Sequence, residues 1–362
     1  MKRILHVVGA RPNYMKIAPI VREMAKFPDD FAQTLVHTGQ HYDKNMSKLF
    51  FDELDMPRPD INLEVGSGSH AVQTAQVMLR FEPVIEQFRP DWLLVPGDVN
   101  STLACALVAV KRGVKVAHVE AGLRSFDRTM PEEINRLLTD QISDLLLTHS
   151  PEAKENLIRE GVAPETVHLV GNTMIDTLVR LMPLAEDRWP SLGEQFGLDE
   201  FVLVTLHRPS NVDAAVGLNE IISALNAVSA SVPVIFPVHP RTRGRIAEHS
   251  IDVRESVRLS DPIGYVDFLA LQAHAAAVVT DSGGVQEETT FLGVPCLTVR
   301  ENTERPITIE QGTNQLVARN CESIVAAIRA AIEQPRYSHA HRPEFWDGKA
   351  AERIVALFRS LN

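Results

Sequence analysis

The sequence repeats one unit along most of its length: a short β-branched or leucine-rich run, then a glycine or polar corner, then a segment with helical spacing. This alternation is typical of parallel strands joined by helices. It predicts an α/β protein built on parallel sheets. We expect strands at residues 4–8, 34–37, 92–95, 116–119, 145–147 and 167–170, and again at 202–206, 234–238, 277–280 and 296–299.

The length of the chain predicts two domains. Its 362 residues exceed the size that one compact core ordinarily reaches. Prolines and glycines among acidic residues interrupt the repeating pattern within residues 181–200. Because such residues punctuate regular structure, they indicate a domain boundary in that segment.

Charge and cysteine spacing narrow the class of protein. The formal net charge of −11 argues against a nucleic acid or an anionic membrane as a partner, since both are bound by clustered lysines and arginines. No apolar stretch approaches the roughly 20 residues that span a bilayer. Cys105, Cys296 and Cys321 lie far apart, in no metal-ligand or redox spacing, which favours a cytoplasmic protein without a metal site.

The glycine-rich segment at residues 66–71 resembles only part of a dinucleotide fingerprint. It lacks the last glycine, and no acidic residue ends a second strand about 20 residues later. No Walker A sequence is present either. We therefore expect a loop at this position and neither NAD nor ATP as a cofactor.

Polar corners follow most of the expected strands. In open parallel sheets, ligands bind outside the carboxyl ends of the strands, so these corners should converge on one crevice. With two sheets, that crevice is expected between the domains. The corners are residues 9–12, 39–41, 97–98, 120–124, 207–209, 239–241 and 281–284.

The corner Asp281-Ser282-Gly283-Gly284 has the features of a phosphate site. It lies between a small apolar strand and a helix-forming segment, which places free backbone N–H groups at a helix N-terminus. Glycines also let the backbone approach a ligand closely. Taken alone, the sequence is as typical of an ordinary tight turn, and its surroundings favour the phosphate site.

Two of the three charged residues near this turn suit a nucleotide. Glu288 is placed to accept the two hydroxyl groups of a ribose, and Arg305 supplies the cation that a diphosphate needs. For Glu287, complementing the helix dipole is the expected role. The turn and these residues predict a site for a nucleoside diphosphate.

Carboxylates and cations also occur at strand ends of the first half. Asp98 and Glu120 follow the third and fourth expected strands, and Glu132 opens a later helix. Asp98 also suits a helix cap, whereas Glu120 has no evident capping role. Arg11 and Lys16 add positive charge after the first strand.

Two alternatives stay open for residues of this half. Glu132 and Glu133 suit the dipole of a helix whose apolar stripe runs through residues 134, 137, 138, 142 and 145, with Glu132 paired to Arg136. His118 lies inside a strand and is expected to be a hydrogen-bonded core residue. His207 instead ends a strand, where it suits donation to a phosphate or proton transfer.

These segments together closely resemble the non-hydrolysing UDP-N-acetylglucosamine 2-epimerases over nearly the whole chain. The resemblance implies two Rossmann-like domains in a glycosyltransferase-B arrangement, at 1–172 and 173–347, with the active site in the interdomain cleft. A last helix within 348–362 is implied to return toward the N-terminal domain. The matching segments are residues 9–12 with Lys16, 38–41, 96–98, 118–124, 131–136, 170–172, 207–208, 280–288 and 303–306.

The resemblance also implies the roles of individual residues and a homodimer. UDP would be eliminated from the sugar to give a 2-acetamidoglucal and then added back, so that C2 is inverted without NAD, metal or other cofactor. Two acid–base groups must then flank the ring. The implied catalytic residues are Asp98, Glu120, Glu132 and His207. The implied residues that bind the UDP-sugar are Arg11, Lys16, Phe268, Ser282, Gly283, Gly284, Glu288 and Arg305.

Other functions share parts of this pattern. A 2-epimerase for another UDP-2-acetamido sugar, such as a 2,3-diacetamido-glucuronate, is the nearest alternative. A hydrolysing epimerase fits less well because Arg11 and Lys16 follow the first strand. A glycosyltransferase gives no reason for the three carboxylates, and a nucleotide-sugar sensor gives no reason for the acid–base set.

Overall fold

The chain forms two compact units in a computed structural model that describes residues 1–39, 58–197, 200–333 and 342–361. Unit 1 comprises Met1–Arg180 and Glu344–Asn362, and unit 2 comprises Leu181–Pro343. The sequence placed the corresponding boundaries after residues 172 and 347. Each unit contains its own sheet, and both sheets are parallel, which confirms the predicted α/β class.

The sheet of unit 1 has seven strands in the order β3-β2-β1-β4-β5-β6-β7. Its central strands are buried along their length, which explains their continuous apolar sequence. The strands are β1 (Lys2–Val8), β2 (Phe31–His37), β3 (Ile61–Asn62), β4 (Trp92–Pro96), β5 (Lys115–Val119), β6 (Leu145–Thr148) and β7 (Val167–Leu169).

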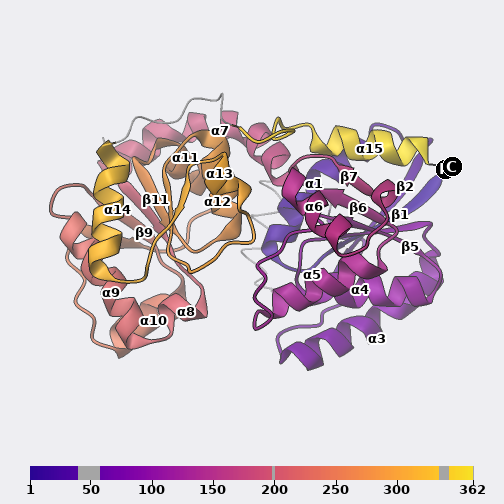
Figure 1. The fold of residues 1–362 in the computed structure, drawn as a ribbon, viewed down its shortest axis with the longest axis horizontal. Helices are drawn as coiled ribbons and strands as arrows, with labels where there is room; N and C mark the ends of the chain where they lie inside the picture. The colour runs from indigo at the N-terminus through magenta and orange to yellow at the C-terminus, as the bar shows by residue number, and fades with distance from the viewer. Residues whose placement is uncertain (40–57, 198–199, 334–341, 362) are drawn as a thin grey trace. The chain divides into compact units, whose positions relative to one another are not determined.

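Helices cover both faces of this sheet. Figure 1 shows α3, α4 and α5 together below the strands, and α15 above them beside α1. Apolar side chains of α3 and α4, such as Phe81 and Ala104, pack on strand residues such as Leu93 in one core. The helices of unit 1 are α1 (Arg11–Met24), α3 (His70–Phe88), α4 (Asn100–Lys111), α5 (Pro131–Ile142), α6 (Pro151–Arg159) and α15 (Ala350–Ser360).

The sheet of unit 2 has six strands in the order β10-β9-β8-β11-β12-β13. Alternate residues of its strands enter two cores, since Val202 and Val204 pack with α9 and α14, whereas Leu203 packs with α11 and α12. The strands are β8 (Val202–Thr205), β9 (Val234–Pro237), β10 (Val257–Ser260), β11 (Ala277–Thr280), β12 (Cys296–Thr298) and β13 (Asn314–Leu316). The helices are α8 (Pro209–Val212), α9 (Ala215–Val228), α10 (Pro240–Glu248), α11 (Tyr265–His274), α12 (Gly283–Leu292), α13 (Ile307–Glu310) and α14 (Cys321–Glu333).

The segment expected to contain a domain boundary, residues 181–200, is largely helical, and the two units divide between Arg180 and Leu181. Helix α7 (Thr173–Phe196) begins in unit 1, ends in unit 2 and contains Pro183 and Pro190. Proline removes one backbone donor, yet here the helix continues through both positions. The breakers within 181–200 therefore do not mark the end of a helix.

Helix α5 is buried mainly on its polar side, and of the predicted apolar stripe only Ile142, which packs against the core, and Leu145, which is buried in β6, are covered. Leu138 is 48% exposed, and Ile134 and Leu137 are half-buried. Ion pairs and hydrogen bonds with the strand ends hold the polar side in place of apolar packing. The buried residues of α5 are Glu133, Asn135, Arg136, Thr139 and Asp140.

Helix α15 packs on α1 within unit 1. Its first N–H groups, those of Ala350 and Ala351, donate to the Asp176 carboxylate at 3.0 and 2.7 Å. A carboxylate at a helix N-terminus satisfies donors that lack partners within the helix. In the described part of the chain, no helix combines the length and apolar content that crossing a membrane requires.

Candidate active site

The corner after β4 holds Asp98 beside a glycine in the left-handed region. Gly97 has φ +64°, and its N–H donates to the carbonyl of Val119 at 2.9 Å. The Asp98 carboxylate accepts two bonds from the Arg136 guanidinium, at 2.9 and 2.8 Å. The helix-cap role considered for Asp98 is wrong, because Val99 occupies the N-cap of α4 and Asp98 binds an arginine instead.

Glu120 occupies the neighbouring corner, after β5, in a left-handed conformation. Its φ is +71°, a value that non-glycine residues rarely adopt. Its N–H donates to the carbonyl of Leu147 at 3.0 Å, and its buried carboxylate pairs with the Lys16 ammonium of α1. The surrounding hydrogen bonds thus hold a carboxylate at a strand end at the cost of backbone strain.

The two corners and Lys16 form one cluster. A Cβ atom on Gly97 would lie 2.9 Å from Lys16 Nζ and 3.4 Å from Glu120 Oε2. Only glycine therefore lets the β4 corner pass this close to the ion pair. The structure thus places the corner that carries Asp98 beside Glu120 and Lys16 in unit 1.

Glu132 lies half-buried in the first turn of α5. Glu133 and Arg136 of the same helix bind each other, and Arg136 also binds Asp98. Among the described residues, the ion pair within this helix joins Arg136 to Glu133 rather than to Glu132. Glu133 also accepts from the N–H groups of Ser125 and Phe126, at 3.0 and 2.9 Å. The pair expected between Glu132 and Arg136 is therefore wrong, and Glu132 remains a candidate acid or base.

The turn after β11 begins a helix, as the sequence predicted. Ser282 is the N-cap of α12, and Gly283 and Gly284 form its first turn. The Asp281 carboxylate points to the adjacent loop, accepting from the N–H groups of His207 and Arg208 at 3.1 and 2.9 Å. Burial alone raises the pKa of Asp281, but these hydrogen bonds and His207 lower it overall. Asp281 therefore fixes this loop, and the Ser282 N–H donates to Thr280 Oγ1 at 3.0 Å, so the free donors at this helix start are the N–H groups that follow it.

Arg305 covers the start of α12. Its guanidinium donates to Glu287 at 2.7 Å and to Glu304 at 2.5 Å. A side chain on Gly283 would collide with this guanidinium, so glycine is required there. Glu287 is thus a buried partner of Arg305, and the dipole role expected for it is wrong.

Two more arginines gather beside this turn and were missed by the sequence analysis. Arg300 pairs with Glu304 at 2.8 Å, and Arg208 lies 3.6 Å from the same carboxylate. Burial and the neighbouring Arg300 lower the pKa of Arg208. The spacing of these residues along the chain gave no signal, because their proximity depends on how three loops of unit 2 fold. Together with Arg305 they bring three arginines to this turn, where Glu304 and Glu287 are their carboxylate partners.

Glu288 is buried one residue beyond Glu287. It accepts a hydrogen bond from the Tyr265 hydroxyl at 2.8 Å. Burial raises the pKa of Glu288 to about 7, although the bond from Tyr265 opposes the shift. Phe268, on the same helix as Tyr265, is half-buried and packs against the core of unit 2.

His207 is the most exposed candidate. Its side chain is 56% exposed, and its Nδ1 lies 3.1 Å from Asp281 Oδ1. Two predicted features lie outside the described part of the chain: the side chain of Arg11, and Gln40 with His41.

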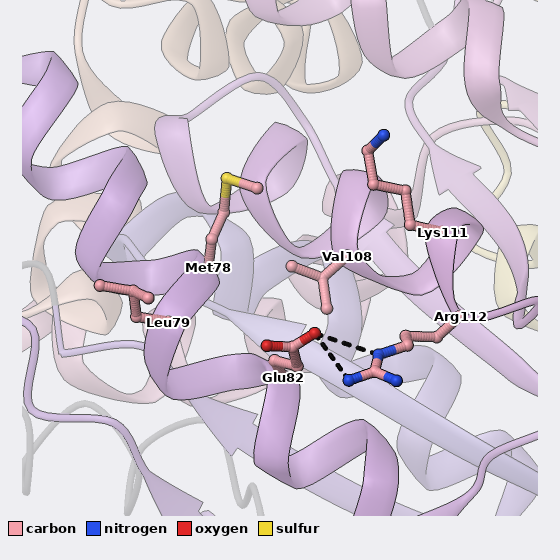
Figure 2. Close-up of a pocket in the computed structure, with 6 residues that line it drawn as sticks. All are labelled: Met78, Leu79, Glu82, Val108, Lys111 and Arg112. Carbon is pink, nitrogen blue, oxygen red and sulfur yellow. Dashed lines mark hydrogen bonds and ion pairs between the residues drawn. The ribbon is translucent and has the colours of Figure 1, made fainter.

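A separate surface hollow contains none of these residues. Figure 2 shows it between α3 and α4, with the Arg112 guanidinium donating to Glu82. Met78, Leu79 and Val108 supply its apolar part. The hollow has no acid–base set comparable to the corners of β4 and β5.

Comparison with known proteins agrees with this geometry. The family model for UDP-N-acetylglucosamine 2-epimerase matches residues 23–359. A UDP-N-acetylglucosamine 2-epimerase from Methanocaldococcus jannaschii is 42% identical, over 97% of each chain. A UDP-2,3-diacetamido-2,3-dideoxy-D-glucuronate 2-epimerase from Pseudomonas aeruginosa is 41% identical, over 99% of this chain and 100% of its own.

A solved structure shows the same fold. The chain is similar to the Methanocaldococcus jannaschii UDP-GlcNAc 2-epimerase in complex with UDP-GlcNAc and UDP, with a TM-score of 0.91 and 41% identity, covering 98% of this chain and 99% of that one. Structures of this kind have a glycosyltransferase-B-like fold. The family matches nearly the whole chain in sequence and in fold, and the resemblance read from the motifs is confirmed: the chain belongs to the UDP-N-acetylglucosamine 2-epimerase family and is an epimerase.

Proposed function

We propose that the protein interconverts UDP-N-acetylglucosamine and UDP-N-acetylmannosamine without releasing free sugar. The observation that carries this proposal is the buried pair of Glu120 and Lys16, which lies against the Gly97 corner that carries the half-buried Asp98. Inversion at C2 requires one group to take a proton and another to return one. A cluster of carboxylates with nearby cations supplies such groups.

Unit 2 has the complementary role in this proposal. Ser282, the N–H groups of Gly283 and Gly284, and the guanidinium of Arg305 hold the diphosphate, and Glu288 accepts from the ribose. His207 donates to the diphosphate as its bond to the sugar breaks. Phe268 lies beside the uracil, and Arg11 contributes positive charge.

The reaction proceeds in two steps, the elimination of UDP and its re-addition. A base of unit 1 removes the C2 proton as the C1–O bond to UDP breaks, which leaves a C1=C2 double bond in a 2-acetamidoglucal. A second group then delivers a proton to the opposite face of C2 as UDP adds back to C1. Asp98, Glu120 and Glu132 provide these proton transfers, and UDP leaves and returns as the anion that unit 2 binds.

The nearest rival substrate is a UDP-2,3-diacetamido-glucuronate, because a 2-epimerase named for that sugar is also 41% identical. Separate incubations with the two nucleotide sugars, resolved by anion-exchange chromatography, would distinguish them. We expect UDP-N-acetylmannosamine from UDP-N-acetylglucosamine. Turnover of the diacetamido sugar alone would overturn the substrate assignment, and free N-acetylmannosamine would show a hydrolysing enzyme.

We further propose that the protein is a homodimer joined through α3, α4 and α5. Val72 and Leu79 of α3 and Leu138 of α5 are 56%, 65% and 48% exposed, while α5 buries its polar side within unit 1. Arg112 and Glu82 add both signs of charge beside this surface (Figure 2). A twofold interface needs such self-complementarity, because the same patch faces itself.

Sedimentation velocity tests this interface. Leu79→Glu should convert the dimer to a monomer, whereas Val216→Glu should leave it a dimer, since Val216 is 78% exposed in unit 2. A Leu79→Glu variant that stays dimeric would exclude this surface as the interface.

A further inference from the structure

A buried histidine lies directly behind the two catalytic corners. His118 is 1% exposed in β5, with its Nε2 2.7 Å from the carbonyl oxygen of Gly97 and its Nδ1 2.6 Å from Asp140 Oδ1. A carbonyl oxygen only accepts hydrogen bonds, and so does an ionised carboxylate. If Asp140 is ionised, both ring nitrogens of His118 must donate, which requires a positively charged ring.

The other partners of Asp140 support its ionised form. Its Oδ2 accepts from the Gly122 N–H at 3.1 Å and lies 2.8 Å from Arg124 Nη1, and both are obligate donors. Burial on its own raises the pKa of Asp140, but its bonded partners, the Arg124 guanidinium among them, outweigh it and lower the pKa. The carboxylate therefore stays charged, and the shared proton belongs to the ring.

This pair connects the two corners. Gly97, held by His118, precedes Asp98 directly, and Gly122, held by Asp140, follows Glu120 by two residues. Glu120 is strained at φ +71°, and Gly97 turns the chain at φ +64°, where glycine is the most flexible residue, so both corners need bonds that keep them in place. The His118–Asp140 pair supplies one such bond to each corner.

We propose that His118 is a positioning residue, charged in the folded protein, which with Asp140 holds the Asp98 and Glu120 corners in their reactive arrangement. The role rests on the proposed C2 epimerisation. Misplacing a catalytic group by about 1 Å costs roughly 100-fold in rate. Loss of the bond to Gly97 should therefore lower kcat and leave the binding of UDP, which unit 2 holds, unchanged.

Two variants of similar shape separate the two bonds of the ring. The substitution His118→Gln places an amide donor near the position of Nε2 and retains the bond to Gly97, whereas His118→Asn places one near Nδ1 and loses that bond. We expect His118→Asn to lower kcat roughly 100-fold with KM within about threefold, and His118→Gln to lose less than about tenfold. Equal kcat values for the parent and a folded His118→Asn variant would overturn the proposal.

The charge on the ring is tested in the unaltered protein, so that misfolding of a variant cannot decide the outcome. Nitrogen NMR of protein with ¹⁵N-labelled histidine rings should show one buried histidine with both nitrogens protonated at neutral pH. His6 of β1 is the internal control, because burial lowers its pKa to about 4 and its ring stays neutral. A neutral His118 ring would overturn the proposal, whereas a parent protein without C2 exchange would instead contradict the proposed function.

Discussion

The corner after β5 in unit 1 and the turn after β11 in unit 2 both follow a buried parallel strand. The first presents a negatively charged side chain, whereas the second presents backbone N–H groups that suit an anion. After β11, helix α12 begins at Gly283, so its first N–H groups are available to an anion. After β5, no helix begins until Pro131, and the corner presents the Glu120 side chain instead. At these two strand ends, the immediate helix leaves N–H groups for an anion, whereas the loop presents a carboxylate.

The ion pairs of the two regions also differ in which charge lies at the strand end and which charge compensates it. In unit 1, Lys16 and Arg136 neutralise the carboxylates of Glu120 and Asp98. In unit 2, the carboxylates of Glu287 and Glu304 neutralise Arg305, which covers the helix N-terminus. The comparison predicts that substitutions in unit 1 affect proton transfer and that those in unit 2 affect the hold on UDP.

The largest effect is expected from Glu120→Gln. The amide cannot take a proton, so the rate of C2 exchange should fall about 1,000-fold or more, while the Kd for UDP stays within about twofold. Exchange is measured by NMR and UDP binding by calorimetry. Glu155→Gln, at an exposed position of α6, is the control and should retain full activity. Unimpaired turnover in Glu120→Gln would remove Glu120 from the catalytic set.

Removal of the partner of Glu120 should destabilise the fold. Lys16→Met leaves a buried carboxylate without its cation, which costs about 3 kcal/mol or more in the free energy of unfolding. Urea denaturation measures this loss. The double variant Lys16→Met with Glu120→Gln should recover most of the stability but not the activity. Equal stability of the single and double variants would show that the ion pair does not compensate the buried charge.

Glu288 should make the stability of unit 2 dependent on pH. Its pKa is about 7 in the folded protein against 4.5 for a free side chain, so the folded protein favours the neutral form. The contribution of Glu288 to the free energy of unfolding is therefore complete below about pH 4.5 and is lost as the pH rises through 7. The loss amounts to about 3 kcal/mol at about 1.4 kcal/mol per pH unit. Calorimetric scans from pH 5 to 8 should show a smaller fall in stability for Glu288→Gln than for the parent. Parallel curves would contradict this account of Glu288.

The smallest effect tests the glycine at the start of α12. In Gly283→Ala the new methyl group meets the Arg305 guanidinium, which must move, so we expect UDP to bind about 10-fold more weakly. Gly244→Ala is the matched control, because its Cβ would meet nothing within 4 Å, and UDP affinity should not change. The same loss in both variants would show a general effect of alanine rather than displacement of Arg305.

The sequence predicted the strands that are buried on both faces most accurately. β4, β5, β6 and β11 read as continuous apolar runs because helices cover them on both sides. The strands that it missed are β3, β10 and β13, which lie at sheet edges where the apolar signal is weaker. Local composition therefore identifies the centre of a sheet better than its margins.

Helix α5 shows where pattern reasoning fails. Its apolar residues predict a buried stripe, but the buried side carries Asn135, Arg136 and Asp140, which bind the corners of β4 and β5. A polar network that replaces apolar packing is not visible in residue spacing. The pairing of Lys16 with Glu120 is equally invisible, because the two residues lie 104 positions apart.

The sequence predicted which residues belong to the candidate site, but not which side chains they contact. Asp98, Glu120 and the Ser282 turn were found from their positions at strand ends. The roles of Asp281 and Glu287 were not, since Asp281 binds the His207 loop and Glu287 binds Arg305 only once unit 2 has folded. Spacing locates a side chain along the chain, whereas its partner depends on the tertiary fold.

Deuterium incorporation at C2 tests the central claim most directly. The protein is incubated with UDP-N-acetylglucosamine in deuterated water and the nucleotide sugar is followed by proton NMR. We predict that deuterium appears at C2 and that the manno epimer accumulates while still attached to UDP. A substrate that keeps its C2 proton and its configuration would contradict the account.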